Sequence, residues 1–190
     1  MKQLRIGISR RTVIEAWVHY DARKKSHTVP DFQLWSWDNA DYLDQQLERL
    51  GFKTGIIAGF LSWTFSAMTL EDLRRCAVVS HAVPGSPTCL GQLEGTDALQ
   101  AWRPNRATDW YGPLNAGGAL TEHEPLLIRR SVRSESPATW YLEDGSGRAL
   151  AIVQTVQCRS FDAVVGYAYV AGVPDGASAF MRRHFPQLLE

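Results

Sequence analysis

The pentapeptide Asp144–Arg148, with the sequence DGSGR, holds the residue types best suited to chemistry in this chain of 190 residues. Two interpretations of it are open. Asp-Gly is a common turn dipeptide, and the β-branched residues that follow Arg148 could continue as the second strand of a hairpin. In the other interpretation the pentapeptide opens a helix, whose first backbone N–H groups have no partner within the helix and can hold a phosphate.

The residues that follow the pentapeptide favour the helix. Between Arg148 and Gln157, apolar side chains recur at a period of about 3.6 residues and would share one helical face, namely Ala149, Ile152, Val153 and Val156. The alanines and the leucine of this stretch also favour a helix. A tight hairpin turn needs only two residues, whereas this segment offers three small ones in succession. We therefore expect a phosphate-binding loop that leads into a helix.

Each residue of this loop has an expected role in holding the phosphate. Gly145 and Gly147 let the backbone approach the phosphate closely. Ser146 adds a hydroxyl donor, and Arg148 adds a forked cation that matches phosphate oxygens. The loop is therefore expected to bind the phosphates of a cofactor.

Other residues could complete the site. Glu143 and Asp144 carry hard carboxylate oxygens that suit Mg²⁺, although they could equally be solvated acids at a strand end. The segment from Gly91 to Gly118 has little hydrophobic periodicity, and long loops are often functional. Within it, Arg106 and Trp110 combine a cation with a flat ring, as a lid over a nucleotide base would, although structural packing would also explain them.

The elements that must position this loop follow from the hydrophobic pattern of the last third of the chain. Strands are expected at residues 124–130 and 138–143, a helix at 148–157, a β-rich stretch at 161–173 and a short amphipathic helix at 177–189. The order strand, strand, helix, strand predicts a mixed α/β unit.

The first part of the chain is expected to hold further helices. Asp38 as N-cap and Gly51 as C-cap bound a helix with leucines at helical spacing. Thr69 and Asp72 form a short capping arrangement. Residues 3–20 begin with a strand-like run and continue with a segment that the pattern does not assign, and the polar residues 21–31 indicate a loop.

The run from Glu124 to Gln154, EPLLIRRSVRSESPATWYLEDGSGRALAIVQ, resembles the core of the ParB/sulfiredoxin superfamily. In that pattern a strand of the type pIxVR is followed by a strand that ends in yxDGhHR and then by a helix. The later segment YAYVAGVPD, residues 167–175, is similar to the end of that core. The resemblance spans residues 120–176 and implies a ParB/sulfiredoxin-like mixed sheet.

The resemblance also implies an activity. Members of the superfamily include sulfiredoxins, chromosome-partitioning nucleotide switches and small-molecule kinases, which bind nucleotide phosphates at the start of the helix. It implies ATP or ADP with Mg²⁺ as cofactors, and a small-molecule substrate. In similar kinases an acidic residue upstream of the motif is the base. Here Glu124 is the candidate, with Asp144 and Arg148 as the other catalytic residues, although Glu124 could also be a surface acid.

This chain departs from the family pattern at two positions. Ser146 stands where sulfiredoxins have cysteine, so sulfinic-acid repair through a thiol intermediate is not expected. Gly147 lacks the histidine of the common motif, which removes one phosphate contact. Ser146 could partly replace that contact.

Composition restricts the remaining possibilities. Twenty basic and twenty acidic residues give zero net charge, which disfavours non-specific nucleic-acid binding. Three widely spaced cysteines without a CxxC pair favour reduced thiols in a cytoplasmic protein over zinc or disulfides. No apolar run is long enough to cross a bilayer, so no membrane partner is expected. The oligomeric state does not follow from the sequence.

We therefore expect a single domain. It would have an N-terminal elaboration at residues 1–118, a ParB/sulfiredoxin-like core at 119–176 and a tail at 177–190. The leading functional hypothesis is a nucleotide-dependent enzyme, a small-molecule phosphotransferase or ATPase. The alternatives are a non-catalytic nucleotide switch or DNA-associated binding module, and an interaction protein in which DGSG is only a turn.

Overall fold

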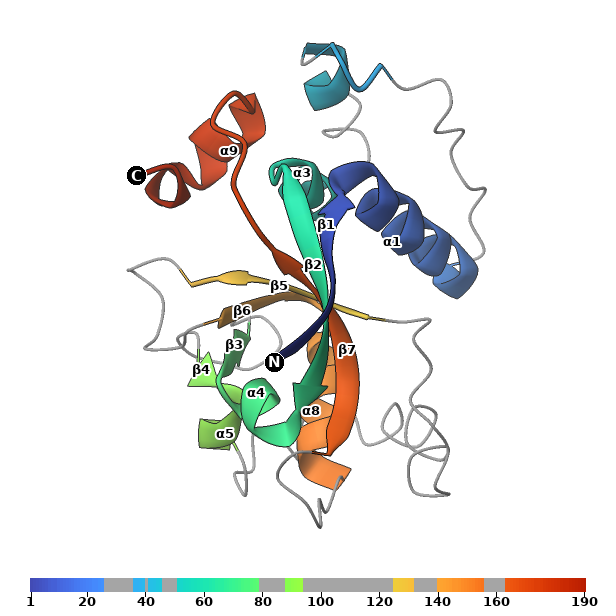
Figure 1. Cartoon of the computed structure of the whole chain (residues 1–190), viewed down its shortest axis with the longest axis vertical. Helices are drawn as coiled ribbons and strands as arrows, with labels where there is room; N and C mark the ends of the chain where they lie inside the picture. The colour runs from blue at the N-terminus through green and yellow to red at the C-terminus, as the bar shows by residue number, and fades with distance from the viewer. Residues whose placement is uncertain are drawn as a thin grey trace. The chain divides into compact units, whose positions relative to one another are not determined.

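A computed structural model describes the chain at residues 1–25, 36–39, 41–45, 51–78, 88–93, 125–131, 140–155 and 163–190 (Figure 1). The chain divides into two compact units, each made of two stretches. Unit 1 comprises Met1–Leu4 and Phe65–Val170, and unit 2 comprises Arg5–Thr64 and Ala171–Glu190. These stretches have other boundaries than the three segments expected from the sequence, and the single domain stays a prediction.

The fold is of the mixed α/β class, as the sequence predicts. The described strands form one sheet in the order β1-β2-β7-β5-β6-β3-β4. Their bounds are β1 Lys2–Ser9, β2 Ser62–Thr69, β3 Cys76–Val78, β4 Thr88–Cys89, β5 Leu126–Arg130, β6 Trp140–Asp144 and β7 Val164–Ala171. Strand β5 pairs antiparallel with β6 and parallel with β7, whereas β3 pairs parallel with β6 and antiparallel with β4. The strands predicted at 124–130, 138–143 and 161–173 correspond to β5, β6 and β7.

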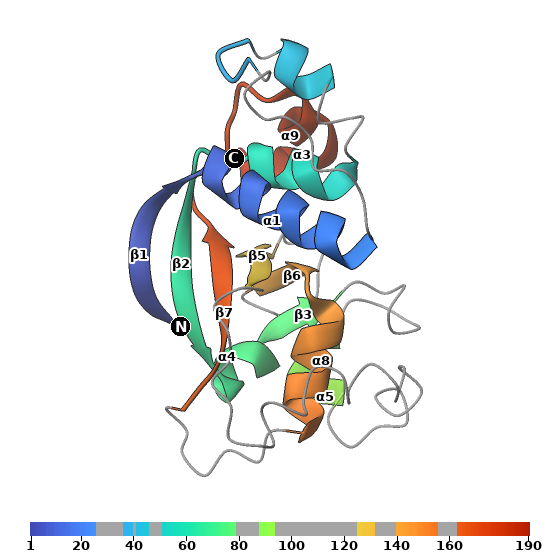
Figure 2. The ribbon, with the colours of Figure 1, turned by 90° about the vertical axis from the view of Figure 1, so that its right-hand side faces the viewer.

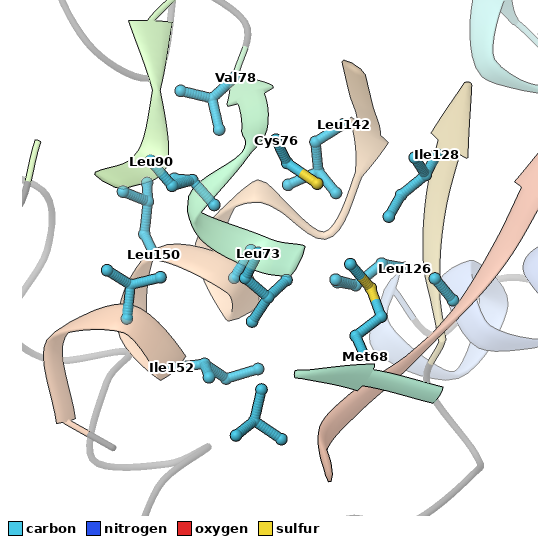
Figure 3. Close-up of a cluster of buried hydrophobic side chains, with 14 of the residues drawn as sticks. Met68, Leu73, Cys76, Val78, Leu90, Leu126, Ile128, Leu142, Leu150 and Ile152 are labelled. Atoms are coloured by element: carbon cyan, nitrogen blue, oxygen red, sulfur yellow. The ribbon is translucent and has the colours of Figure 1, made fainter. Parts of the chain in front are cut away.

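The core of unit 1 is a cluster of aliphatic side chains between one face of the sheet and three helices (Figure 3). The helices are α4 (Leu70–Arg74), α5 (Leu90–Leu93) and α8 (Ser146–Thr155). Period-two alternation directs Leu126, Ile128 and Leu142 into this cluster. From α8, Ala149, Ile152 and Val153 meet them, which confirms the predicted helical face, while Val156 lies outside the described residues. Burial of this aliphatic surface provides the main stabilisation of the unit.

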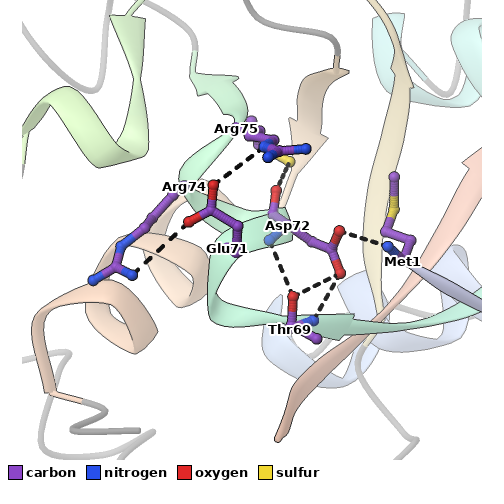
Figure 4. A network of polar contacts seen from close by, with 7 residues as sticks. Met1, Thr69, Glu71, Asp72, Arg74 and Arg75 are labelled. Atoms are coloured by element: carbon purple, nitrogen blue, oxygen red, sulfur yellow. Dashed lines mark hydrogen bonds and ion pairs between the residues drawn. The ribbon is translucent and has the colours of Figure 1, made fainter. Parts of the chain in front are cut away.

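A polar network holds the start of α4 (Figure 4). The Oγ1 atom of Thr69 accepts from the backbone N–H of Asp72, and the Asp72 carboxylate accepts from the N–H of Thr69, at 3.2 and 2.9 Å. This is the capping box predicted from the sequence. The α-ammonium of Met1 donates to the same carboxylate at 2.5 Å.

These contacts change the acidity of two groups. Burial alone would raise the pKa of Asp72, but the hydrogen bonds from Met1 and Thr69 outweigh it and leave the pKa below 3.8. The Cys76 thiol donates to the carbonyl oxygen of Asp72 at 3.4 Å, and its burial raises its pKa to about 12. Cys76 is therefore a buried, unreactive thiol. Cys89 is only half-buried, and Cys158 lies outside the described residues.

In unit 2, helices from distant parts of the sequence contact one another. Helix α1 (Arg10–Lys25) packs against α3 (Phe52–Ala58), and α3 contacts α9 (Ala179–His184), as Figure 2 shows. The Arg10 guanidinium bonds the Asp175 carboxylate at 2.7 Å and the carbonyl oxygen of Ala58 at 3.2 Å. Ser178 caps α9, and a 3₁₀ turn follows at Pro186–Leu188, so the predicted C-terminal helix is confirmed in a shorter form.

Other N-terminal predictions need correction. Helix α1 continues to Lys25, so residues 21–25 are not the start of a loop; residues 26–31 lie outside the description. The helix predicted between Asp38 and Gly51 is present at residues 41–45, but its N-cap is Asn39 and not Asp38. The Asn39 side chain accepts from the N–H of Tyr42 at 3.0 Å. Asparagine and aspartate are equally good caps, so the sequence alone did not separate these neighbours.

Two further segments, residues 56–68 and 91–93, have an irregular sequence pattern but form regular elements. Residues 56–68 contain the end of α3 and most of β2. Residues 91–93, expected to be irregular, belong to helix α5, and residues 94–118 lie outside the described part. In the part of the chain that the structure describes, no helix is long and apolar enough to cross a membrane.

The Asp72 network predicts a stability change with a matched control. We expect Asp72→Asn to lower the free energy of unfolding by about 1–2 kcal/mol at neutral pH, because it removes the carboxylate that closes the capping box. Glu71→Gln, in an exposed neighbour whose partners are Arg74 and Arg75, should change it by less than about 0.5 kcal/mol. Urea titrations of both variants measure the difference.

The same variant has a defined pH dependence. Since the folded carboxyl of Asp72 has a pKa below 3.8, its contribution is complete above that pH and is lost as the pH falls below it. The wild type and Asp72→Asn should therefore differ at pH 7 and converge in strong acid. A constant difference at all pH values would contradict the proposed role of the ionised carboxylate.

Candidate phosphate-binding site

The DGSGR segment forms a strand-to-helix turn. Strand β6 ends at Asp144, Gly145 has a φ of 88°, and α8 begins at Ser146. The backbone N–H of Ala149 donates to the carbonyl oxygen of Gly145 at 2.9 Å, which is the first hydrogen bond of the helix. The helical interpretation is therefore confirmed, and the hairpin is wrong.

Glycine is the only residue type that fits position 145 of this turn without strain. A φ of 88° lies in the left-handed region, which L side chains rarely adopt. A Cβ atom at this position would also collide with the side chain of Leu126 and lie 2.8 Å from Nη2 of Arg148. The local backbone and the packing beneath it both require glycine, so the position of α8 on the sheet depends on this residue.

Arg148 turns back towards the protein. Its side chain is about nine-tenths buried, and Nη2 lies 3.5 Å from both Oδ2 of Asp144 and the carbonyl oxygen of Pro125. The guanidinium thus connects the first turn of α8 to the end of β6 and to the residue before β5. These contacts give Arg148 a part in shaping the loop, and its predicted contact with phosphate stays a prediction.

The backbone at the start of α8 keeps the geometry expected of an anion site. The N–H groups of Ser146, Gly147 and Arg148 precede the first hydrogen bond within the helix, so none of them has an acceptor in the helix itself. The helix dipole places partial positive charge at this end. Ser146 and Gly147 are half-buried, and neither carries a long side chain that would cover the turn.

Glu143 and Asp144 contact different arginines. Glu143 pairs with Arg129 of β5, and Oδ2 of Asp144 lies 3.5 Å from Nη2 of Arg148 in α8. The register between β5 and β6 is irregular next to these acids, so alternation along β6 does not determine their relative directions. Among the residues that the structure describes, no three His, Cys, Asp or Glu side chains gather as a metal site. Both carboxylates thus have an arginine as partner, and the magnesium site predicted from them stays a prediction.

The ion pair of Arg129 and Glu143 is buried within unit 1. Arg129 is only 2% exposed, and its guanidinium lies 4.4 Å from the ring centroid of Tyr141. Nη1 of Arg129 also donates to the carbonyl oxygen of Arg130 at 2.9 Å. Arg130 itself is exposed, because strand alternation directs these two adjacent arginines to opposite faces.

Sequence reasoning missed this pair, although a signal for it exists. Arg129 is directly opposite Tyr141 in the antiparallel register of β5 and β6, which brings Glu143 within reach on the same face. Once two strands are expected to pair, opposite charges on the same face indicate a cross-strand ion pair. The register itself, however, includes an irregularity between Leu127 and Ile128 that the sequence does not reveal.

The other predicted site residues cannot be placed. Glu124, Arg106 and Trp110 lie outside the described residues. Glu124 directly precedes Pro125, whose carbonyl oxygen faces Arg148. The lid and the general base therefore stay predictions.

Comparisons with known proteins add no homologue. No protein-family model, no curated protein and no solved structure matches this chain. The resemblance to the ParB/sulfiredoxin superfamily is thus neither supported nor opposed by them, and it enters below only as part of a proposal.

The turn predicts different effects for two glycines with positive φ. Gly145→Ala should lower the free energy of unfolding by about 2–4 kcal/mol, because it adds a collision to the backbone strain. Gly7→Ala should cost only about 1–2 kcal/mol, since Gly7 has a φ of 68° but nothing within 4 Å of a new Cβ. Chemical denaturation of both variants compares them; equal losses would show that packing beneath Gly145 is unimportant.

The two adjacent arginines of β5 form another matched pair. Arg129→Met should lower the free energy of unfolding by about 3–5 kcal/mol, because it leaves the Glu143 carboxylate buried without its partner. Arg130→Met should change it by less than about 0.5 kcal/mol, since this side chain is exposed. Adding Glu143→Gln to Arg129→Met should recover part of the loss. No recovery in the double variant would contradict the ion pair as the cause.

Proposed function

We propose that this chain binds nucleotide phosphates at the start of α8 and is a nucleotide-dependent enzyme, a small-molecule phosphotransferase or ATPase. One observation carries the proposal. Strand β6 turns into α8 at Gly145, so three successive backbone N–H groups open the helix beside small residues. Phosphates bind readily to such helix starts.

The arrangement of neighbouring elements supports the proposal. Antiparallel strands β5 and β6 lead into α8, and β7 then returns parallel to β5. This is the order of elements that the resemblance to the ParB/sulfiredoxin superfamily implies. In the proposed site the helix end attracts phosphate, Ser146 adds a hydroxyl donor, and Arg148 and Asp144 hold the turn in place.

Catalysis would require residues in addition to the turn. Glu124 is the proposed general base, since it directly precedes Pro125, whose carbonyl oxygen lies 3.5 Å from Nη2 of Arg148. Phosphoryl transfer depends mainly on positioning and on neutralising charge. Because Glu143 and Asp144 each contact an arginine, we assign no step to a metal ion.

The second candidate is a nucleotide-binding module without turnover. It is favoured by the commitment of Arg148 and Glu143 to contacts within the protein, which keeps both from acting freely on a substrate. A DNA-associated role is disfavoured by the zero net charge of the chain.

Binding is tested with a variant that should spare the fold. Millimolar ATP, ADP or CTP should raise the melting temperature of the wild type, since binding at a hundredfold excess over Kd adds about 2.7 kcal/mol. Ser146→Asp should keep or raise the stability of the free protein by about 0.3–1 kcal/mol, because an acid suits a helix start. It should lose the nucleotide shift, since its carboxylate occupies the place of phosphate.

Gln187→Asp, at an exposed position in the 3₁₀ turn, is the charge control and should keep the shift. No shift with any of the three nucleotides, or a shift that survives in Ser146→Asp, would contradict the proposed site. Release of phosphate from ATP then separates the two candidates. An enzyme should lose turnover in Glu124→Gln while it keeps the thermal shift, whereas a binding module shows no turnover in either form.

A further inference from the structure

Strand β6 has one more residue than its partner β5 directly before the turn into α8. Ile128 lies opposite Leu142, and the preceding residue of β5, Leu127, lies opposite Asp144. Glu143 is the additional residue between these two pairs. Such an additional residue is a β-bulge, which bends its strand and increases the local twist.

The pairing of the two strands does not require this bulge. If Glu143 were absent, the next residue, Asp144, could still lie opposite Leu127 in a regular antiparallel ladder. Gly145 could also keep its place beside Leu126, with which a Cβ atom at position 145 would collide. A strand one residue shorter could therefore form the same pairs without a bulge.

The bulge also has a cost for the sheet. Glu143 is only 8% exposed, and its carboxylate pairs with Arg129, which is 2% exposed. Replacing such a buried ion pair by apolar side chains of similar volume is often neutral or stabilising, so stability alone does not explain the pair. The ladder of hydrogen bonds is interrupted at a bulge as well. A costly feature that the pairing does not require is typical of a functional site.

The place of the bulge indicates which function it has. Directly after it, Asp144 ends β6, Gly145 forms the turn and α8 begins at Ser146. A bend at Glu143 therefore sets the direction in which the chain leaves the sheet. The two neighbouring acids also have partners in different elements, because Glu143 pairs within the sheet and Asp144 contacts Arg148 of α8.

We propose that the bulge at Glu143 positions the backbone N–H groups of residues 146–148 for nucleotide phosphate. The additional residue bends the end of β6, and this bend directs the first turn of α8. The inference rests on the proposed function, since it concerns the same site. The number of residues before the turn is decisive, and the charge of Glu143 is not, since its carboxylate is held by Arg129. Glu143 is thus a positioning residue that acts through the backbone.

Two variants separate the additional residue from its charge. Arg129→Met/Glu143→Met keeps the length of β6 and replaces the ion pair by two apolar side chains. Arg129→Met with Glu143 deleted removes the same charges and shortens the strand by one residue. Calorimetric titration with ATP, ADP and CTP, without added metal ions, measures the dissociation constants of both variants and of the wild type. Circular dichroism and urea titration establish whether each protein is folded.

The two variants should differ in nucleotide binding. The doubly substituted variant should bind within about threefold of the wild type, since apolar side chains can replace a buried ion pair and the bulge is retained. The deletion variant should be folded, because every other pair of the ladder is kept. It should bind at least about tenfold more weakly, because a binding site tolerates displacements of only about 0.5 Å.

Three outcomes would overturn this inference and leave the proposed function standing. The deletion variant could bind as tightly as the wild type, so that the bulge has no part in binding. The substituted variant could bind as weakly as the deletion variant, so that the ion pair and not the additional residue positions the turn. An unfolded deletion variant would show that the ladder itself requires residue 143. If the wild type binds none of the three nucleotides, the proposed function is contradicted, and the inference with it.

Discussion

The positive φ of Gly145 is the constraint on which the construction of unit 1 depends. It converts an extended backbone into a helical one within a single residue, so that α8 returns over the sheet that its own chain has just left. The side chains of α8 then complete the aliphatic core with Leu126, Ile128 and Leu142. The candidate phosphate-binding turn and the hydrophobic core therefore share one residue, and neither can be altered independently of the other.

The charged residues around the turn mainly form ion pairs with other residues of the protein. Arg148 closes the turn from within, and Glu143 neutralises Arg129 on the opposite face of the sheet. Burying such charges is costly unless each has a partner, which explains why these groups occur together. In the proposed function, the attraction for phosphate consequently comes from oriented backbone dipoles rather than from a long cationic side chain. Phosphate binding of this kind would tolerate the loss of one side chain but not a change in the backbone conformation of the turn.

Much of the last third of the chain could be predicted, because its signals are local. The period of the apolar residues after Arg148 predicted α8, and the hydrophobic pattern of residues 124–130 predicted β5. The capping box of Thr69 with Asp72 followed from three residues of spacing. The direction of the Arg148 side chain could not be predicted, since it depends on where β5 begins relative to α8. For the same reason, the partnership of Arg129 with Glu143 required the strand register.

Where local signals were weak or balanced, the prediction was wrong or absent. The segment 10–25 has apolar and charged residues without a clear helical stripe, yet it forms α1 because α3 covers it. Asp38 and Asn39 compete for the same capping role, and only the backbone decides between them. The stretch 56–68 is mostly apolar, and only the alternation of Ser62, Thr64 and Ser66 with Trp63 and Phe65 indicates that its second half is a strand.

The place of β7 in the sheet has a consequence for how the protein is made. This strand joins β1 and β2 on one side to β5, β6, β3 and β4 on the other, yet it begins about 95 residues after β2 ends. Because a ribosome adds roughly 5–20 residues per second, β7 is synthesised seconds after β1 and β2. Pairings between such distant segments also slow the search for the native state. The sheet is thus completed only after the last residue of β7, Ala171, has been synthesised.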